Sequence, residues 1–165
     1  MRRPFLLTLV IALLALTATS AHATTSYQPD LVFGSAGDDI YGPDPAQHAS
    51  QGVSPAFGIA YQFEAQNDGT QTDTLRLRLR GSGDPDIWAR VTVGTTDVTS
   101  EFSPGPYRVR DLAPGGAATF GFGLAATTAA TPGDTHTFRL VARSAGDPTA
   151  RDVWVFDVTV LAQPP

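Results

Sequence analysis

The sequence contains no cysteine and no lysine, and its only methionine is Met1. Without cysteine, no disulfide can stabilise the fold, and neither thiol redox chemistry nor a thiolate metal site is possible. Two histidines, His48 and His136, follow the first 23 residues. They lie far apart and lack the spacing of metal ligands, which argues against zinc or copper binding. We therefore predict no metal and no other cofactor.

The absence of lysine makes arginine the only basic residue type. Eleven arginines stand against 16 acidic residues, which gives a formal net charge of −5. An acidic chain is poorly suited to bind nucleic acid or an anionic membrane over its whole surface. Abundant alanine without lysine is typical of a GC-rich bacterial genome.

The first 23 residues have the three parts of a secretory signal peptide. Two arginines precede an apolar run from Phe5 to Leu16, and Ala21-His22-Ala23 offers small residues where a signal peptidase reads. The run is too short to span a bilayer, which takes about 20 residues. We predict export to the periplasm or the extracellular space, with no membrane insertion after cleavage. Residues 24–165 would then form one domain with nine arginines against 16 acids, a net charge of −7.

A period of two residues dominates the rest of the chain, and no stretch sustains a helical period. Between Ala56 and Arg80, apolar side chains first fall on alternate positions up to Ala65, and leucines then alternate with arginines up to Arg80. This is the pattern of strands with one buried face. Asn67-Asp68-Gly69 between them is a turn signal.

Similar runs predict the remaining strands. They cover residues 30–33, 87–93, 107–110, 119–124, 138–143 and 152–161, with a long polar loop over residues 34–55. Seven or eight short strands separated by Gly, Pro and Asp turns are typical of a sandwich of two sheets. We predict an all-β fold, a single immunoglobulin-like antiparallel β-sandwich spanning residues 24–165.

The order of several turn motifs resembles a known class of modules. These motifs are Pro29-Asp30-Leu31, Gly37-Asp38-Asp39-Ile40-Tyr41, Gln66-Asn67-Asp68-Gly69-Thr70, Asp97-Val98-Thr99, Leu112-Ala113-Pro114-Gly115-Gly116 and Ser144-Ala145-Gly146-Asp147-Pro148. Together they resemble bacterial extracellular Ig-like modules, similar to CARDB (cell-adhesion-related) domains and to the Ig-like module of bacterial α-galactosidases. The resemblance implies a spacer or adhesion element without catalytic residues. Because this copy follows a signal peptide directly, we expect it to bind something itself.

No stretch has the signature of a catalytic or metal site. Ser144, His136 and Asp147 supply the residue types of a hydrolytic triad but no nucleophile elbow. Residues 34–42 resemble one turn of a calcium-binding nonapeptide repeat, and one copy cannot build a site that lies between stacked repeats. We predict a polar loop there, and a protein that is not an enzyme.

Arginine supplies the main candidate binding site. In an immunoglobulin-like sandwich the third strand neighbours the penultimate one, which would place five arginines on one outer face: Arg76, Arg78, Arg80, Arg139 and Arg143. Their guanidinium groups can bind carboxylate, sulfate or phosphate. The alternative is an ordinary solvated face whose arginines pair with Glu64 or Asp157.

Trp88 is the second candidate, since an exposed tryptophan can stack on a sugar ring. It lies on the opposite parity from Ile87, Ala89 and Val91. We nevertheless expect it to be buried, because tryptophans in strands usually pack. Tyr61 and Trp154 are expected in the core.

These observations predict an exported, non-catalytic Ig-like module that binds a partner or forms part of the bacterial cell envelope. Its partner would be an exported protein or a polysaccharide. The alternatives are a module specific for anionic polysaccharide and an accessory subunit of a secreted enzyme. A binder needs an exposed patch, whereas an enzyme needs a pocket with convergent titratable groups.

Overall fold

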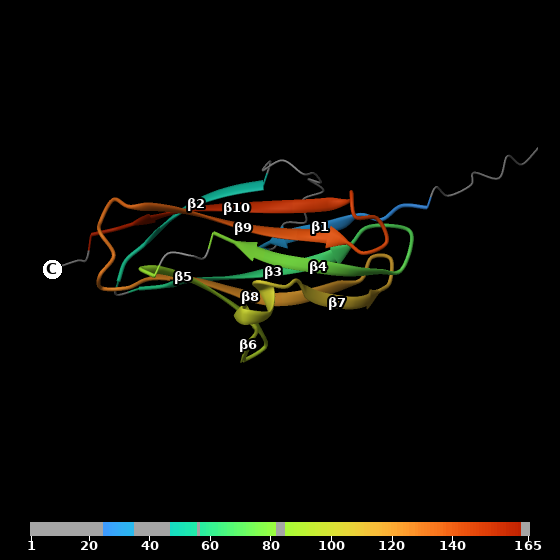
Figure 1. The fold of residues 1–165 in the computed structure, drawn as a ribbon, viewed down its shortest axis with the longest axis horizontal. Coiled ribbons are helices and arrows are strands. Elements are labelled where there is room, and N and C mark those ends of the chain that lie inside the picture. Colours follow the sequence, from blue (N-terminus) through green and yellow to red (C-terminus); the bar gives the residue numbers. More distant parts are fainter. Residues whose placement is uncertain (1–24, 35–46, 56, 82–84, 163–165) are drawn as a thin grey trace, which may run out of the picture.

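A computed structural model describes residues 25–34, 47–55, 57–81 and 85–162. The expected signal peptide and residues 35–42 of the calcium-repeat-like loop lie outside these ranges. Within them, ten strands form two five-stranded sheets that pack face to face (Figure 1). The immunoglobulin-like β-sandwich predicted from the alternating pattern is confirmed.

The first sheet has the strand order β1-β3-β8-β5-β6 and the second β2-β10-β9-β4-β7. The strands are β1 (Pro29–Phe33), β2 (Gln47–Val53), β3 (Ile59–Asn67), β4 (Asp73–Arg80), β5 (Ile87–Val93), β6 (Thr96–Asp97), β7 (Tyr107–Leu112), β8 (Ala117–Ala126), β9 (Thr135–Ser144) and β10 (Arg151–Val160). A short 3₁₀ helix, η1 (Thr99–Phe102), follows β6. Together β6 and η1 project beyond β5 on one side of the sandwich (Figure 1).

The structure corrects two details of the predicted fold. The described residues form ten strands, not seven or eight, because β2 lies inside the expected loop over residues 34–55 and β6 is a two-residue strand that pairs with β5. In addition, β2 pairs with β10 in parallel, so the second sheet is mixed. The chain leaves the first sheet after β1 and continues along the edge of the second. Few residues of β2 are buried, and its sequence therefore lacks the alternation that marks the other strands.

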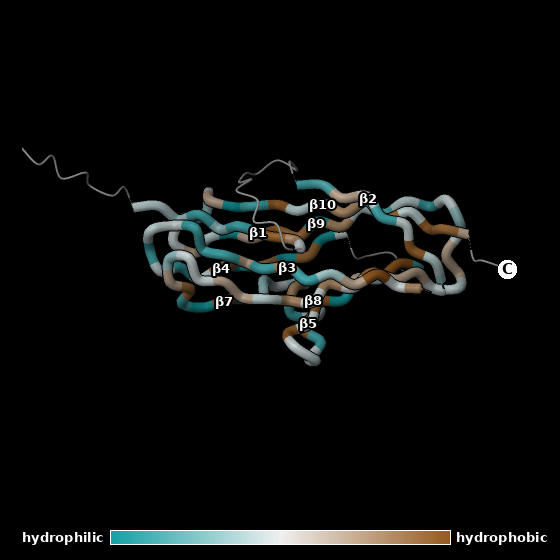
Figure 2. Tube along the Cα trace, turned by 180° about the vertical axis from the view of Figure 1, so that it is seen from behind, coloured by the Kyte–Doolittle hydropathy of each residue, from teal (hydrophilic) through white to brown (hydrophobic). Residues whose placement is uncertain are grey.

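Aromatic rings fill the space between the sheets. Phe63 stacks on Phe33 of β1 and on Phe120 of β8, with ring centroids 5.1 and 4.9 Å apart. Phe122 meets Phe156 of the opposite sheet at 4.9 Å, and Trp154 in turn stacks on Phe156 at 5.0 Å. Aromatic pairs of this kind stabilise a core beyond their burial alone. Figure 2 shows that hydrophobic positions are interspersed with hydrophilic ones along the strands.

Asn67 determines how the arginine-bearing strand is reached. Its side chain is fully buried, donates to the carbonyls of Gln71 and Leu112 at 2.8 Å each, and accepts from the Gly69 amide. The turn joins strands of opposite sheets and does not close a hairpin, since β3 and β4 belong to different sheets. After this turn the chain enters the second sheet, where β4 pairs with β9 and β7.

No helix in the described ranges is long and apolar enough to cross a membrane.

Candidate functional site

The predicted arginine cluster forms on the outer face of the second sheet. Because β4 and β9 are antiparallel neighbours, Arg76 lies opposite Arg143, and Arg80 lies opposite Arg139. Arg78 lies between them, opposite Val141. The leucines of β4 are buried while its arginines reach solvent. The structure therefore brings together all five arginines that the sequence selected.

Two further arginines extend this cluster. Arg108 of β7 lies opposite Arg76, and Arg151 of β10 lies opposite Arg143. One row across four strands thus reads Arg108, Arg76, Arg143, Arg151, and neighbouring strands are about 4.8 Å apart. Sequence reasoning missed both ends, because alternation shows which side of a strand a residue occupies but not its register against a neighbour. We call these seven residues the arginine face: Arg76, Arg78, Arg80, Arg108, Arg139, Arg143 and Arg151.

No acidic side chain among the described residues neutralises the arginine face. The two ion pairs among the described residues are His48 with Asp157 and Arg90 with Asp97, and neither includes an arginine of this face. Glu64 lies in the other sheet and accepts hydrogen bonds from Gln66 and Thr119. The expectation that the arginines pair with Glu64 or Asp157 is therefore wrong. Within this face, the Nε atom of Arg76 is buried without a hydrogen-bond partner.

Asp157 marks the end of the arginine face along β10. Its carboxylate accepts hydrogen bonds from the Thr137 hydroxyl at 2.6 Å and contacts Nε2 of His48 at 2.7 Å. The Thr137 bond and the His48 contact lower the pKa of Asp157 below its usual value. The carboxylate is consequently ionised at neutral pH and engaged with β2 and β9 rather than with the arginines.

The surface between the arginine side chains is hollowed in two places. One hollow of about 190 Å³ is lined by Arg76, Arg78, Arg80, Arg143, Pro106 and Val141. A second of about 140 Å³ is lined by Arg80, Arg139, Arg143, Arg151, Val141 and Val153. Both are bordered by guanidinium groups, and Val141 belongs to both. Such hollows suit planar or tetrahedral anions, which guanidinium groups bind through paired N–H donors.

Trp88 does not join the arginine face, and its predicted burial is wrong. The side chain is 46% exposed on the outer face of the first sheet. Ile87, Ala89 and Val91 occupy the core side of β5, and Trp88 projects the other way over Ala125 of β8. The small neighbours on that side cannot cover an indole ring. Tyr61 and Trp154, by contrast, pack against the core as expected.

The residues that could have formed a hydrolytic triad are separated. His136 and Ser144 stand eight positions apart on the extended strand β9, which corresponds to roughly 26 Å. The Ser144 hydroxyl is buried and accepts the Asp147 amide at 2.9 Å, which shapes a turn. Among the described residues, no group of three or more His, Asp or Glu side chains could hold a metal ion.

Comparison with known proteins supports the fold. No protein-family model and no curated protein sequence matches the chain. Among solved structures, a family 123 glycoside hydrolase from Clostridium perfringens superposes with a TM-score of 0.50 and 8% identity, covering 82% of this chain. The match spans only 28% of that hydrolase.

Two smaller domains are also similar. The CARDB domain of a Pyrococcus furiosus protein, in complex with di-metal ions, has 14% identity and a TM-score of 0.40, with 84% of this chain and 96% of that domain covered. The N-terminal domain of PorA has 9% identity and a TM-score of 0.47, with 81% and 97% covered. Both are Ig-like β-sandwich modules, and TM-scores below 0.5 amount to a general resemblance only.

Proposed function

We propose that this protein is an exported, non-catalytic Ig-like binding module of the bacterial cell envelope or its surroundings, and that its arginine face binds an anionic polysaccharide. The observation that carries the proposal is the row of four arginines in direct cross-strand register without an acidic partner in the described part of the chain.

The charge distribution supports binding rather than simple solubility. A sheet face can be kept soluble by interspersed charges of both signs, and like charges placed directly opposite one another are destabilising. This chain has more acids than bases, yet it gathers seven arginines on one face. Sulfate or carboxylate groups of a polymer would supply the missing counter-charges, and each guanidinium offers them a planar fork of donors.

The extent of the face supports a polymeric ligand. The row crosses β7, β4, β9 and β10, a span of roughly 14 Å at the usual strand spacing. A single sulfate or carboxylate contacts only one or two guanidinium groups. A chain with repeated charges, lying across the strands, would engage the four arginines of the row at once, and the linked contacts would raise its overall affinity.

Two further points support a non-catalytic adhesion role. The hollows of the arginine face are lined by arginine, valine and proline, without the acid and base pair that hydrolysis requires. The order of turn motifs resembles CARDB-type modules, and the fold agrees with that class. The proposed kinship with CARDB-type modules rests on these motifs. The proposed export rests on the first 23 residues, which resemble a signal peptide.

The test is binding to polymers that differ in charge alone. The purified protein would be passed over immobilised dextran sulfate, polygalacturonate and uncharged dextran, at low salt and at 0.5 M NaCl. We expect retention on the two anionic polymers and none on dextran. Salt should abolish the retention, because it screens exposed charges.

Variants tie the retention to the face. Arg76→Ala, Arg143→Ala and Arg151→Ala together remove three arginines of the row and should abolish retention, and the corresponding lysine triple should retain only part, because lysine lacks the planar fork. The control is Arg90→Ala, which removes a positive charge from the other sheet, where Arg90 lies opposite Gly123. If the control variant loses retention as fully as the alanine triple, only net charge matters and the assigned face is wrong.

A further inference from the structure

The outer face of the first sheet carries a groove of about 330 Å³, on the side of the sandwich opposite the arginine face. It runs over β3, β8 and β5 and has almost no side chains in its floor. Gly121 and Gly123 of β8 face outward there, because Phe120, Phe122 and Leu124 point into the core. Ala60 and Ala125 complete the floor. The result is a shallow trough at the lower end of the size range of small-ligand sites.

Trp88 forms one wall of this groove. It lies opposite Ala125 in the β5–β8 pairing, and nearly half of the side chain is exposed. The neighbouring position along β5, Arg90, lies opposite Gly123. An exposed indole beside a flat floor offers a platform on which a ring with an apolar face can stack.

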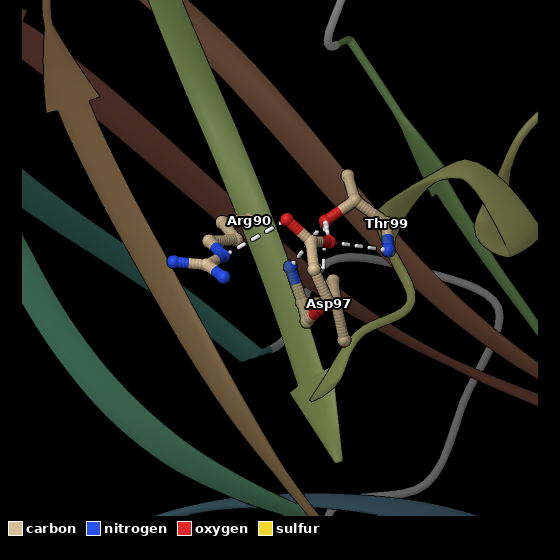
Figure 3. A network of polar contacts seen from close by, with 4 residues as sticks. Arg90, Asp97 and Thr99 are labelled. Atoms are coloured by element: carbon tan, nitrogen blue, oxygen red, sulfur yellow. Dashed lines mark hydrogen bonds and ion pairs between the residues drawn. The ribbon is translucent and has the colours of Figure 1, made fainter. Parts of the chain in front are cut away.

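Arg90 is held at the same wall by an acidic partner. Its Nε donates to Oδ2 of Asp97 at 2.9 Å, and Asp97 accepts from the amide and the hydroxyl of Thr99 through Oδ1. These Thr99 hydrogen bonds and the positive charge of Arg90 lower the pKa of Asp97, which is therefore ionised at neutral pH. The terminal nitrogens of Arg90 point away from Asp97 (Figure 3). They remain available as donors.

The electrostatics select the kind of ligand. Among the described residues, Arg90 is the only charged one that lines the groove, and Asp97 balances it. A polyanion would gain little here, in contrast to the arginine face. The groove instead offers an aromatic platform, a flat floor and fixed N–H donors without net charge. These features match a sugar ring, which has an apolar C–H face and hydroxyl oxygens at its rim.

We propose that this groove binds one pyranose ring of an uncharged glycan, with the ring stacked on Trp88 and its hydroxyl oxygens accepting hydrogen bonds from Arg90. A protein partner fits less well, because the hollow lies on a sheet face and a stable interface buries about 800 Å² on each side. The site does not depend on the arginine face, since the two occupy opposite sheets. The protein would then bind two kinds of polymer at once.

Gly123 allows a test that leaves the fold intact. A Cβ at this position would lie 3.8 Å from the Ile59 carbonyl oxygen and 3.9 Å from Arg90 Cβ, which are ordinary contacts. Gly123→Val should therefore fold as well as the natural chain, and β-branched residues favour strands. Its side chain would occupy the floor of the groove. Gly121 is unsuitable for the same substitution, because a Cβ there would collide with the Thr92 hydroxyl.

The experiment is titration calorimetry of the purified protein with cellohexaose, mannohexaose, xylohexaose and chitohexaose, with tryptophan emission recorded in parallel. We expect at least one of the four to bind, to shift the emission, and to bind equally in 0.5 M NaCl. Trp88→Ala and Gly123→Val should each weaken that affinity about tenfold or more. Phe57→Ala is the control, because Phe57 is 69% exposed but does not line the groove.

Three outcomes would overturn the proposal. The first is that none of the four oligosaccharides binds at 10 mM. The second is that Gly123→Val binds as tightly as the natural chain while its unfolding curve is unchanged. The third is a concentration-dependent increase in mass that Trp88→Ala abolishes, which would assign the groove to a second copy of this chain. The alanine triple of the arginine face should leave oligosaccharide binding unchanged, so the two proposals can fail separately.

Discussion

Arg143 is the position where the charge of the arginine face can be measured as stability. It lies directly opposite Arg76 on one side and Arg151 on the other. Facing side chains in a sheet have Cβ atoms about 5 Å apart, so we take roughly 6 Å between charges. Coulomb's law in water then gives about 0.7 kcal/mol of repulsion for each pair. Salt at 0.15 M approximately halves that value.

Removing the central charge should therefore stabilise the fold. We expect Arg143→Gln to raise the free energy of unfolding by about 1 kcal/mol at low salt, because two repulsive pairs of about 0.7 kcal/mol each disappear and solvent exposure weakens both. Arg143→Glu should raise it by about 1–2 kcal/mol, because both pairs become attractive. The same variants should bind dextran sulfate more weakly. A cluster of like charges that lowers the free energy of unfolding but is needed for binding is what we expect of a binding site.

Urea denaturation at 10 mM and 500 mM NaCl measures the effect. The gain in both variants should shrink at high salt without a change in the slope against urea. Arg110→Gln is the matched control, since Arg110 is exposed and has no cross-strand arginine in the β4–β7 register. If both Arg143 variants are no more stable than the natural chain at low salt, the guanidinium groups do not repel one another. The electrostatic basis of the proposed function would then be wrong.

Two further predictions concern the fold around this face. Gly81 and Gly115 both have positive φ, but a Cβ at Gly81 would also collide with the Thr137 carbonyl, whereas Gly115 has open space. Gly115→Ala should lower the free energy of unfolding by about 1 kcal/mol, and Gly81→Ala should lower it by about 2 kcal/mol more, because the backbone must shift. Urea titration of both variants measures these losses, and equal losses would contradict the collision. Asp157 has its pKa lowered below 3.8 in the folded state, so it stabilises the fold above the unfolded pKa and loses that contribution as pH falls through the folded one. The stability difference between the natural chain and Asp157→Asn should be present at pH 6 and shrink to its smallest value below pH 3, and a difference independent of pH would refute the assignment.

The alternating pattern predicted most of the strands closely. Leucines and arginines in β4, and phenylalanines and glycines in β8, show directly which side of each strand is buried. This works because side chains alternate sides in any extended chain, whatever lies next to it. The five central arginines followed from the expected neighbourhood of β4 and β9 in an Ig-like sandwich. β2 escaped prediction, because an edge strand that buries few residues has no alternation to show.

Composition and local pattern determined that the chain has no thiol chemistry, that it folds into strands, and which residues of each strand face outward. The tertiary structure alone decided which outward residues meet. Arg108 and Arg151 join the row only through the registers of β7 against β4 and of β10 against β9, and a shift of one residue would turn them to the other side. Trp88 is exposed because its neighbours across the strands are small. Burial depends on side chains that are distant in the sequence, and the sequence of a single strand does not show which of them cover it.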